Sequence, residues 1–202
     1  MANVILVAAL VTASWSALLR VAWCVVGFVR MFRNHSRAAV SKWGWVQVAV
    51  VPEAYILGAA ALVLWLRANN GGAPTAAGLS CAIAGAGLSV SGVLVSVWTF
   101  LTFPTIGTGH YISEGQTIVI KGPYAWVRHP TYLGVLLLWF GLGLAYRTIP
   151  LLVLASCYAL IYQVYARAEE EMLTASFGEP YRNYCSRVGR FLPRSLQPFR
   201  AA

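Results

Sequence analysis

The chain has 202 residues, of which 59% are hydrophobic and only 10% are charged. Soluble domains carry about a quarter charged residues, so this composition excludes an ordinary water-soluble fold. The net charge of +9 fits anionic lipid better than nucleic acid here, because basic residues beside membrane spans contact lipid headgroups and set orientation. We therefore expect a bilayer partner and no nucleic-acid partner.

Five apolar stretches are each long enough to cross a bilayer core of about 30 Å as a helix. They run from Val4 to Val29, from Trp43 to Leu66, from Thr75 to Phe103, from Tyr132 to Ile149 and from Pro150 to Ala166. No basic start precedes the first stretch, so it is interpreted as a retained span, not a cleaved signal peptide. The sequence thus predicts an all-α integral membrane protein with five transmembrane helices, forming a single domain over residues 1–202.

Small residues and charged residues inside these stretches indicate how the predicted helices pack against one another. Glycine recurs every seven residues in the third and fourth spans, which predicts close helix packing; these glycines are Gly78, Gly85, Gly92, Gly134 and Gly141. Only Arg147–Pro150 separates the last two spans, and proline suits the first turn of a helix, so a tight antiparallel hairpin is expected. Arg20 and Glu53 fall at similar depths in the first two spans, and either could pair with the other or serve alone.

The distribution of basic residues predicts the orientation. The first loop contains Arg30, Arg33, Arg37 and Lys42, the third contains Lys121 and Arg128, and six arginines follow the fifth span, whereas the second and fourth loops contain only Arg67 and Arg147. The positive-inside rule then puts the N-terminus outside and the third loop and C-terminal segment in the cytosol. The cysteines show no paired CxxC spacing, so neither a disulfide framework nor a metal site is predicted.

The third loop leads into the predicted start of a helix, where an anion could bind. The residue before a proline avoids helical geometry, and proline favours the first helical position, so His129 is expected at the N-cap with Pro130 opening the fourth span. The amides of Thr131 and Tyr132 would then face the cytosolic boundary, where a carboxylate or phosphate could bind. The plainer alternative is that His129 only caps the helix and Tyr132 is an interface aromatic.

Half of the six acidic residues form one cluster, Glu169, Glu170 and Glu171. Such a cluster is often a solvated helix turn, here with an ion pair between Arg167 and Glu171. The predicted hairpin, however, returns these glutamates to the face that carries His129. A cationic or polyhydroxyl ligand could therefore be held between the two segments.

Two sequence motifs in this part of the chain resemble those of a known family. The segment GPYAWVRHPTYLG, followed after the predicted hairpin by EExxLxxxFGxxYxxYxxRV from Glu169 to Val188, is similar to the core of the isoprenylcysteine carboxyl methyltransferases and the related phospholipid methyltransferases. The match covers about residues 105–193. The resemblance implies three N-terminal spans in 1–103 and a catalytic core in 104–202, with a cytosolic cap over S-adenosyl-L-methionine, made of the third loop and the C-terminal helix.

The resemblance also assigns residues. The cofactor-binding positions that match the family's motifs are Gln116, Thr117, Ile118, Val119, Tyr124, His129, Pro130, Thr131, Tyr132 and Glu169. Where the family has a substrate-binding arginine this chain has Tyr165, so Arg167 is the candidate to orient an acceptor carboxylate. An amine acceptor would need a base, for which Glu170 and His129 are candidates. Methyl transfer needs no metal.

The acceptor implied by the resemblance is a lipophilic one, above all the carboxylate of an isoprenylated cysteine. The alternatives are an ethanolamine phospholipid methylated on nitrogen, a small thiol, or, less in keeping with the number of spans, a nicotinamide-dependent sterol reductase. A membrane scaffold or transporter would explain the spans but not the two motifs. Both a bacterial inner membrane and the endoplasmic reticulum fit, with the active site on the cytosolic side.

Overall fold

The computed structural model describes residues 37–42, 58–59, 62, 76–103, 111–113 and 115–199. The first predicted span lies outside the described residues, and so do all but three residues of the second span. Arg20 and Glu53, which are expected either to pair or to serve alone, also lie outside them. Those three residues of the second span, Gly58, Ala59 and Leu62, are helical.

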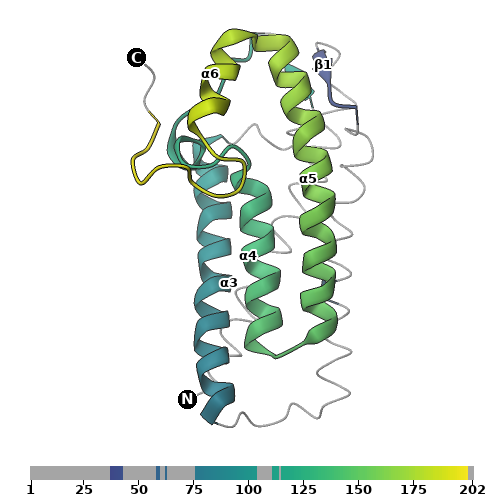
Figure 1. Cartoon of the computed structure of the whole chain (residues 1–202), viewed down its shortest axis with the longest axis vertical. Helices are drawn as coiled ribbons and strands as arrows, with labels where there is room; N and C mark the ends of the chain where they lie inside the picture. Colours follow the sequence, from purple (N-terminus) through teal and green to yellow (C-terminus); the bar gives the residue numbers. More distant parts are fainter. Residues whose placement is uncertain are drawn as a thin grey trace.

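Three long helices lie side by side along the length of the molecule (Figure 1). They are α3 (Ala76–Thr102), α4 (Pro130–Ala145) and α5 (Ile149–Phe177). By length and composition α3 and α5 can each cross a membrane, and α4 is a shorter apolar helix of 16 residues. The third, fourth and fifth predicted spans are thus confirmed as helices. The last one continues well past its predicted end at Ala166.

Glycines bring the backbones of α3 and α4 into direct contact, as predicted. A Cβ atom at Gly92 would lie 2.6 Å from the carbonyl oxygen of Gly134, and one at Gly141 would lie 2.6 Å from that of Gly85. We call this contact between α3 and α4 the glycine seam. Ser89 is buried in it and donates hydrogen bonds to Gly85 O at 2.9 Å and to Leu138 O at 3.3 Å. Any side chain at the glycines would force the helices apart.

The predicted hairpin joins α4 and α5 at the lower end of Figure 1. Arg147 takes a positive φ of 53°, and the amide of Thr148 donates to Gly143 O at 2.8 Å. Pro150 lies in the first turn of α5, as expected for a residue that has no amide hydrogen to offer.

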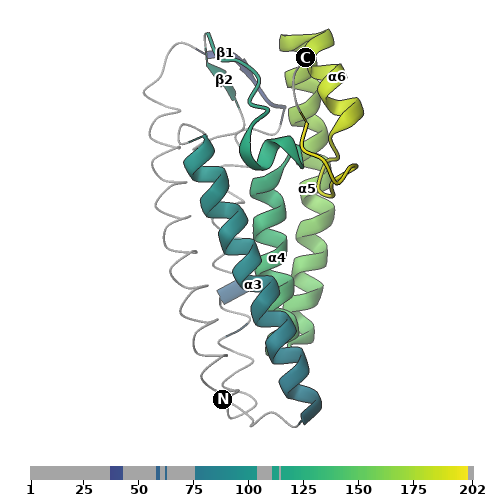
Figure 2. The same ribbon diagram turned by 90° about the vertical axis from the view of Figure 1, so that its left-hand side faces the viewer.

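The opposite end carries the polar elements. A short 3-10 helix, η1 (Gly122–Ala125), leads into α4, and α5 is followed by α6 (Glu179–Arg187) after Gly178, whose φ is +62°. Two strands, β1 (Arg37–Val40) and β2 (Tyr111–Ser113), pair antiparallel in the register Val40 to Tyr111 (Figure 2). This small sheet is absent from the all-α prediction, because strands of three or four residues give too short a pattern to detect.

Candidate functional site

The loop before α4 is held by the chain that follows α6. Val127 and Gly189 form an isolated parallel bridge, and the amide of Arg128 donates to Gly189 O at 2.8 Å. The amide of His129 donates to Arg190 O at 3.1 Å. Pro130 opens α4 and His129 is its N-cap, as predicted, with a non-helical backbone (φ −122°, ψ 64°). The backbone of His129 is therefore fixed on both sides.

The buried imidazole of His129 lies between two carboxylates. Its Nδ1 is 3.3 Å from Oε2 of Glu169, and its Nε2 is 3.1 Å from Oε1 of Glu170. Both ring nitrogens of a histidine donate only when the ring is protonated and positively charged. The geometry is thus that of an imidazolium bridging two glutamates, and the prediction that the hairpin brings His129 to the glutamates is confirmed.

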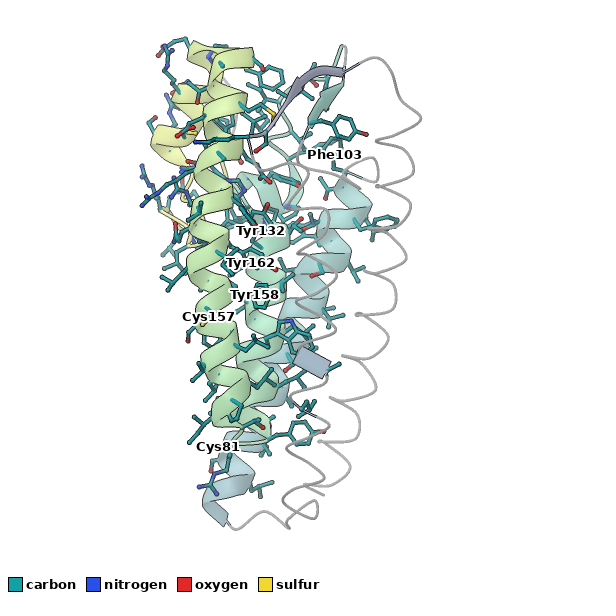
Figure 3. The ribbon with its side chains drawn as sticks, turned by 90° about the vertical axis from the view of Figure 1, so that its right-hand side faces the viewer. Cys81, Phe103, Tyr132, Cys157, Tyr158 and Tyr162 are labelled. Atoms are coloured by element: carbon teal, nitrogen blue, oxygen red, sulfur yellow. The ribbon has the colours of Figure 1, made fainter. Side chains whose placement is uncertain are left out.

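Glu169 is buried, although it belongs to a run of three acidic residues. The hydroxyl of Tyr132 donates to its Oε1 at 2.5 Å. The ring of Tyr132 stacks on Tyr162 with centroids 4.5 Å apart, and Tyr162 is followed by Tyr158 at 5.9 Å. Figure 3 shows these three rings in one column between α4 and α5. The carboxylate therefore sits at the end of an aromatic column that enters the apolar part of the bundle.

Glu170 is the centre of an ion-pair cluster. Arg190 contacts both of its oxygens, Nε to Oε1 at 2.9 Å and Nη2 to Oε2 at 2.6 Å. Arg128 approaches Oε1 with Nε at 3.1 Å and Nη2 at 3.0 Å. The side chains are mostly shielded, with exposed fractions of 7% for Arg128, 14% for Glu170 and 25% for Arg190. Such charge-assisted contacts keep the carboxylate ionised and leave its lone pairs occupied.

The charge state of His129 follows from these neighbours. Burial alone would lower the pKa of the imidazole, but the hydrogen bonds and negative charges of Glu169 and Glu170 outweigh it. The net result is a pKa of His129 above its ordinary value of 6.5. The ring thus tends to carry a positive charge while both carboxylates are ionised.

The other predicted site residues are distributed around this centre. Tyr124 is buried in η1, and its carbonyl accepts a hydrogen bond from the hydroxyl of Tyr184 at 2.7 Å. Thr131 is half-buried in the first turn of α4. Within the stretch Gln116–Val119, Ile118 packs on α6 against the cluster formed by Tyr181, Tyr184 and Val188. Arg167 is exposed on α5 and does not join the cluster around Glu170.

Three residues of the site were not predicted from the sequence as functional: Arg128, Arg190 and Phe191. The ring of Phe191 lies edge-on to His129, with centroids 6.0 Å apart, and to Tyr132 at 6.4 Å. Arg128 directly precedes His129 in the motif, which is a usable signal. Arg190 and Phe191 lie past the second motif, in a segment that only the fold returns to His129.

The fold and the site define a class of protein: a helical membrane protein with a buried histidine, tyrosine and glutamate gathered where its helices meet a polar cap. A model of the phospholipid methyltransferase family matches residues 80–180. That range is half of the chain and includes most of α3, all of α4 and α5, and the centre around Glu169 and Glu170. The chain therefore belongs to the phospholipid methyltransferase family, which confirms the resemblance drawn from the two motifs.

Curated relatives match parts of the chain. The cobalt-zinc-cadmium resistance protein CzcN of Cupriavidus metallidurans is 38% identical over 87 residues, which are 42% of this chain and 40% of the relative. The nickel-cobalt-cadmium resistance protein NccN of Alcaligenes xylosoxydans xylosoxydans is 34% identical over 119 residues, 55% of each protein. Protein-S-isoprenylcysteine O-methyltransferase of Tribolium castaneum is 34% identical over 88 residues, 40% of this chain and 29% of the relative. The chain thus spans about half, or less, of the length of these relatives.

Two of these relatives carry names that refer to metal resistance. Across the described part of this chain, no group of three or more histidine, cysteine, aspartate or glutamate side chains is placed to hold a metal ion. The acidic residues of the centre are instead paired with Arg128, His129 and Arg190.

Proposed function

We propose that this protein is an integral membrane methyltransferase that uses S-adenosyl-L-methionine and transfers the methyl group to a lipophilic acceptor. The observation that carries the proposal is the buried Glu169, held by Tyr132 and His129 at the N-terminus of α4. Membership of a methyltransferase family supports the same activity. The leading acceptor is the carboxylate of an isoprenylated cysteine or a similar lipid.

The residues of the centre fit the chemical groups of such a cofactor. A buried carboxylate attracts an ammonium group or accepts hydrogen bonds from ribose hydroxyls. The N-terminus of α4, where His129 makes no side-chain cap hydrogen bond, attracts a carboxylate. Tyr132 stacks with His129 at 5.5 Å and with Tyr162 at 4.5 Å, so the aromatic rings of the centre pack on one another. A ligand that carries both an ammonium and a carboxylate group would find a partner for each charge.

When bound, the cofactor supplies an electrophilic methyl group on a sulfonium. The protein then has to align the acceptor with that group and exclude water. Glu169 would fix the cofactor, with Tyr132 fixing the direction of the carboxylate. A carboxylate acceptor is already ionised and needs an orienting cation. Arg167 is our candidate, and its exposed position on α5 leaves it accessible to an acceptor that arrives from outside the bundle.

Methylation of an ethanolamine phospholipid is the second candidate, favoured by the description of the matching family. An amine must lose a proton before it attacks, so this reaction requires a base. The sequence offers Glu170 and His129. Because two guanidinium groups occupy the oxygens of Glu170, His129 is the remaining candidate, and it would accept a proton only in its neutral form, which its raised pKa makes less populated.

We further propose the multi-pass topology inferred from the basic residues, with the N-terminus outside and the site on the cytosolic side of a bacterial inner membrane or the endoplasmic reticulum. The polar cap contains Lys121, Arg128, Arg182, Arg187 and Arg190. All of them lie at the end of the bundle where α4 begins, which supports a cytosolic site under the positive-inside rule. The bilayer would then deliver the lipophilic acceptor.

The test is a transfer assay. The purified protein, in detergent or lipid, is incubated with methyl-labelled S-adenosyl-L-methionine and either farnesylated cysteine or phosphatidylethanolamine, and the products are treated with alkali. Label released as methanol from the cysteine identifies a carboxyl methyl ester and supports the leading proposal. Alkali-stable label on the amine supports the second candidate. Absence of both cofactor binding and transfer would overturn the assignment and favour a scaffold or transporter.

A further inference from the structure

Arg190 occupies a position from which it acts on His129 in two ways. Its carbonyl oxygen accepts the amide hydrogen of His129 at 3.1 Å. Its guanidinium contacts both oxygens of Glu170, at 2.9 Å and 2.6 Å, and its third nitrogen, Nη1, donates to Oε1 of Gln163 at 3.0 Å. The guanidinium is therefore bound to α5 at two positions that lie seven residues, or about two helical turns, apart. This defines the orientation of Arg190 more closely than a single ion pair would.

The contacts of Glu170 show what this orientation achieves. Glu170 is fixed by Arg190 on one side and by Arg128 on the other, and the same Oε1 atom then faces Nε2 of His129 at 3.1 Å. Arg128 is itself fixed, because its Nη1 donates to Cys185 O at 2.9 Å and to Val188 O. A carboxylate that is held on both sides presents Oε1 to Nε2 of His129 in one defined place, and Oε1 is then shared by Arg128, Arg190 and His129. The ring of His129 can satisfy it only with a hydrogen on Nε2.

We propose that Arg190 is a positioning residue of the cofactor site: acting through Glu170, it holds the protonated ring of His129 so that Nε2 donates to Glu170 and Nδ1 donates to Glu169. The proposal rests on the proposed function, because it assigns Glu169 to the cofactor. It gives Glu170 a supporting role in place of the role of a base. Phe191, adjacent to Arg190, also packs against the imidazole, in an edge-type contact with centroids 6.0 Å apart.

Among the described residues, the groups that face His129 come from α4, α5 and the segment after α6. Glu169 and Glu170 on α5 face its two nitrogens, Tyr132 on α4 stacks on its ring, and Phe191 covers its edge. Arg128 and Arg190 contribute positive charge but meet Glu170, not the imidazole. The hydrogen bond from Nε2 of His129, and with it the orientation of the ring, therefore depends on Glu170 being held in place, as outer hydrogen-bond partners orient functional histidines.

The experiment is a double-mutant cycle on the full chain, with the affinity for S-adenosyl-L-methionine measured by calorimetry in detergent. The variants are Arg190→Gln, Glu170→Gln and the double variant, and Arg182→Gln is the matched control, because it removes an equal charge from the exposed pair with Glu179. We expect Arg190→Gln to weaken binding about tenfold, the lower end of the effect of such outer partners. In the Glu170→Gln background the same change should have no further effect.

A second measurement needs no cofactor. The ring nitrogens of His129 are followed by NMR in protein labelled with 15N-histidine, with His129→Gln used for assignment. The wild type should show Nε2 protonated throughout the titration, and Glu170→Gln should lose this preference. If neither wild type nor variants bind S-adenosyl-L-methionine but the NMR preference depends on Glu170 and Arg190, the proposed function fails while the positioning holds. Additive effects in the cycle would overturn the positioning role. So would protonation of Nε2 of His129 that stays unchanged in Arg190→Gln.

Discussion

The buried hydroxyl of Tyr132, near the start of α4, donates a hydrogen bond at 2.5 Å to Oε1 of the buried Glu169 on α5. The two residues are 37 positions apart in the sequence. The hairpin between α4 and α5 makes them neighbours. A buried carboxylate needs such a donor, because a charge without hydrogen bonds is costly to bury.

Replacing Tyr132 with phenylalanine removes this donor while keeping the ring. Hydrogen bonds to charged groups contribute about 1.5 to 3 kcal/mol, so Tyr132→Phe should lower the thermal stability and weaken binding of S-adenosyl-L-methionine. Calorimetric titration and a thermal melt in the same detergent measure both effects. Tyr146→Phe, at the far end of α4, is the matched control and should leave cofactor affinity as it is. Equal losses of affinity in both variants would contradict a specific role of Tyr132.

Glu169 and Glu171 form a second matched pair. Glu169 is buried beside His129, whereas Glu171 is exposed. Glu169→Ala removes the carboxylate proposed to hold the cofactor and should abolish measurable binding and methyl transfer. Glu171→Ala removes the same group two residues later and should change neither, because alanine is well tolerated in a helix. A folded Glu169→Ala variant with wild-type affinity would refute the assignment of Glu169 to the cofactor.

Much of this centre follows from the sequence. Proline after His129 predicts both the N-cap and the start of α4, and Arg147–Pro150 predicts the hairpin that returns Glu169 to Tyr132. The burial of Glu169 could not be predicted in the same way. Successive helical residues point about 100° apart, and the sequence before the glutamates does not show which side of α5 faces α4. The phase of the helix is set by packing.

Local sequence patterns do not predict that Arg190 and Phe191 belong to the site. Both follow α6, and they meet His129 only because a parallel bridge joins Val127 to Gly189. A Cβ at Gly189 would lie 3.1 Å from the carbonyl carbon of Leu192, so this turn of the chain depends on glycine. One bridge between distant segments leaves no periodic signal. Of the site, the sequence therefore predicts the motif residues but not the segment that encloses them.

The pH dependence of stability should report on His129. Because its pKa is raised by Glu169 and Glu170 in the folded protein despite burial, the protonated ring stabilises the fold fully below pH 6.5, its ordinary pKa. This stabilisation is lost as the pH rises through the raised pKa of the folded state. Melting temperatures of the wild type and of His129→Gln, measured across this range, should converge as the pH increases. A difference that does not change with pH would contradict the prediction.

The glycine seam between α3 and α4 gives the sharpest structural test. A Cβ at Gly141 would lie 2.5 Å from the backbone nitrogen of Ser89 and 2.6 Å from Gly85 O, distances that no side chain can relieve because the opposing atoms are backbone. Gly141→Ala should therefore separate the helices and lower the melting temperature by overpacking, which costs about 1 to 3 kcal/mol. Gly87→Ala is the control: it is on the exposed side of α3, with nothing within 4 Å of a Cβ. Alanine is favoured over glycine inside a helix by roughly 0.5–1 kcal/mol, so Gly87→Ala should be neutral or stabilising. A loss of stability in Gly141→Ala that is absent from Gly87→Ala would support the close contact of α3 and α4, and equal losses would contradict it.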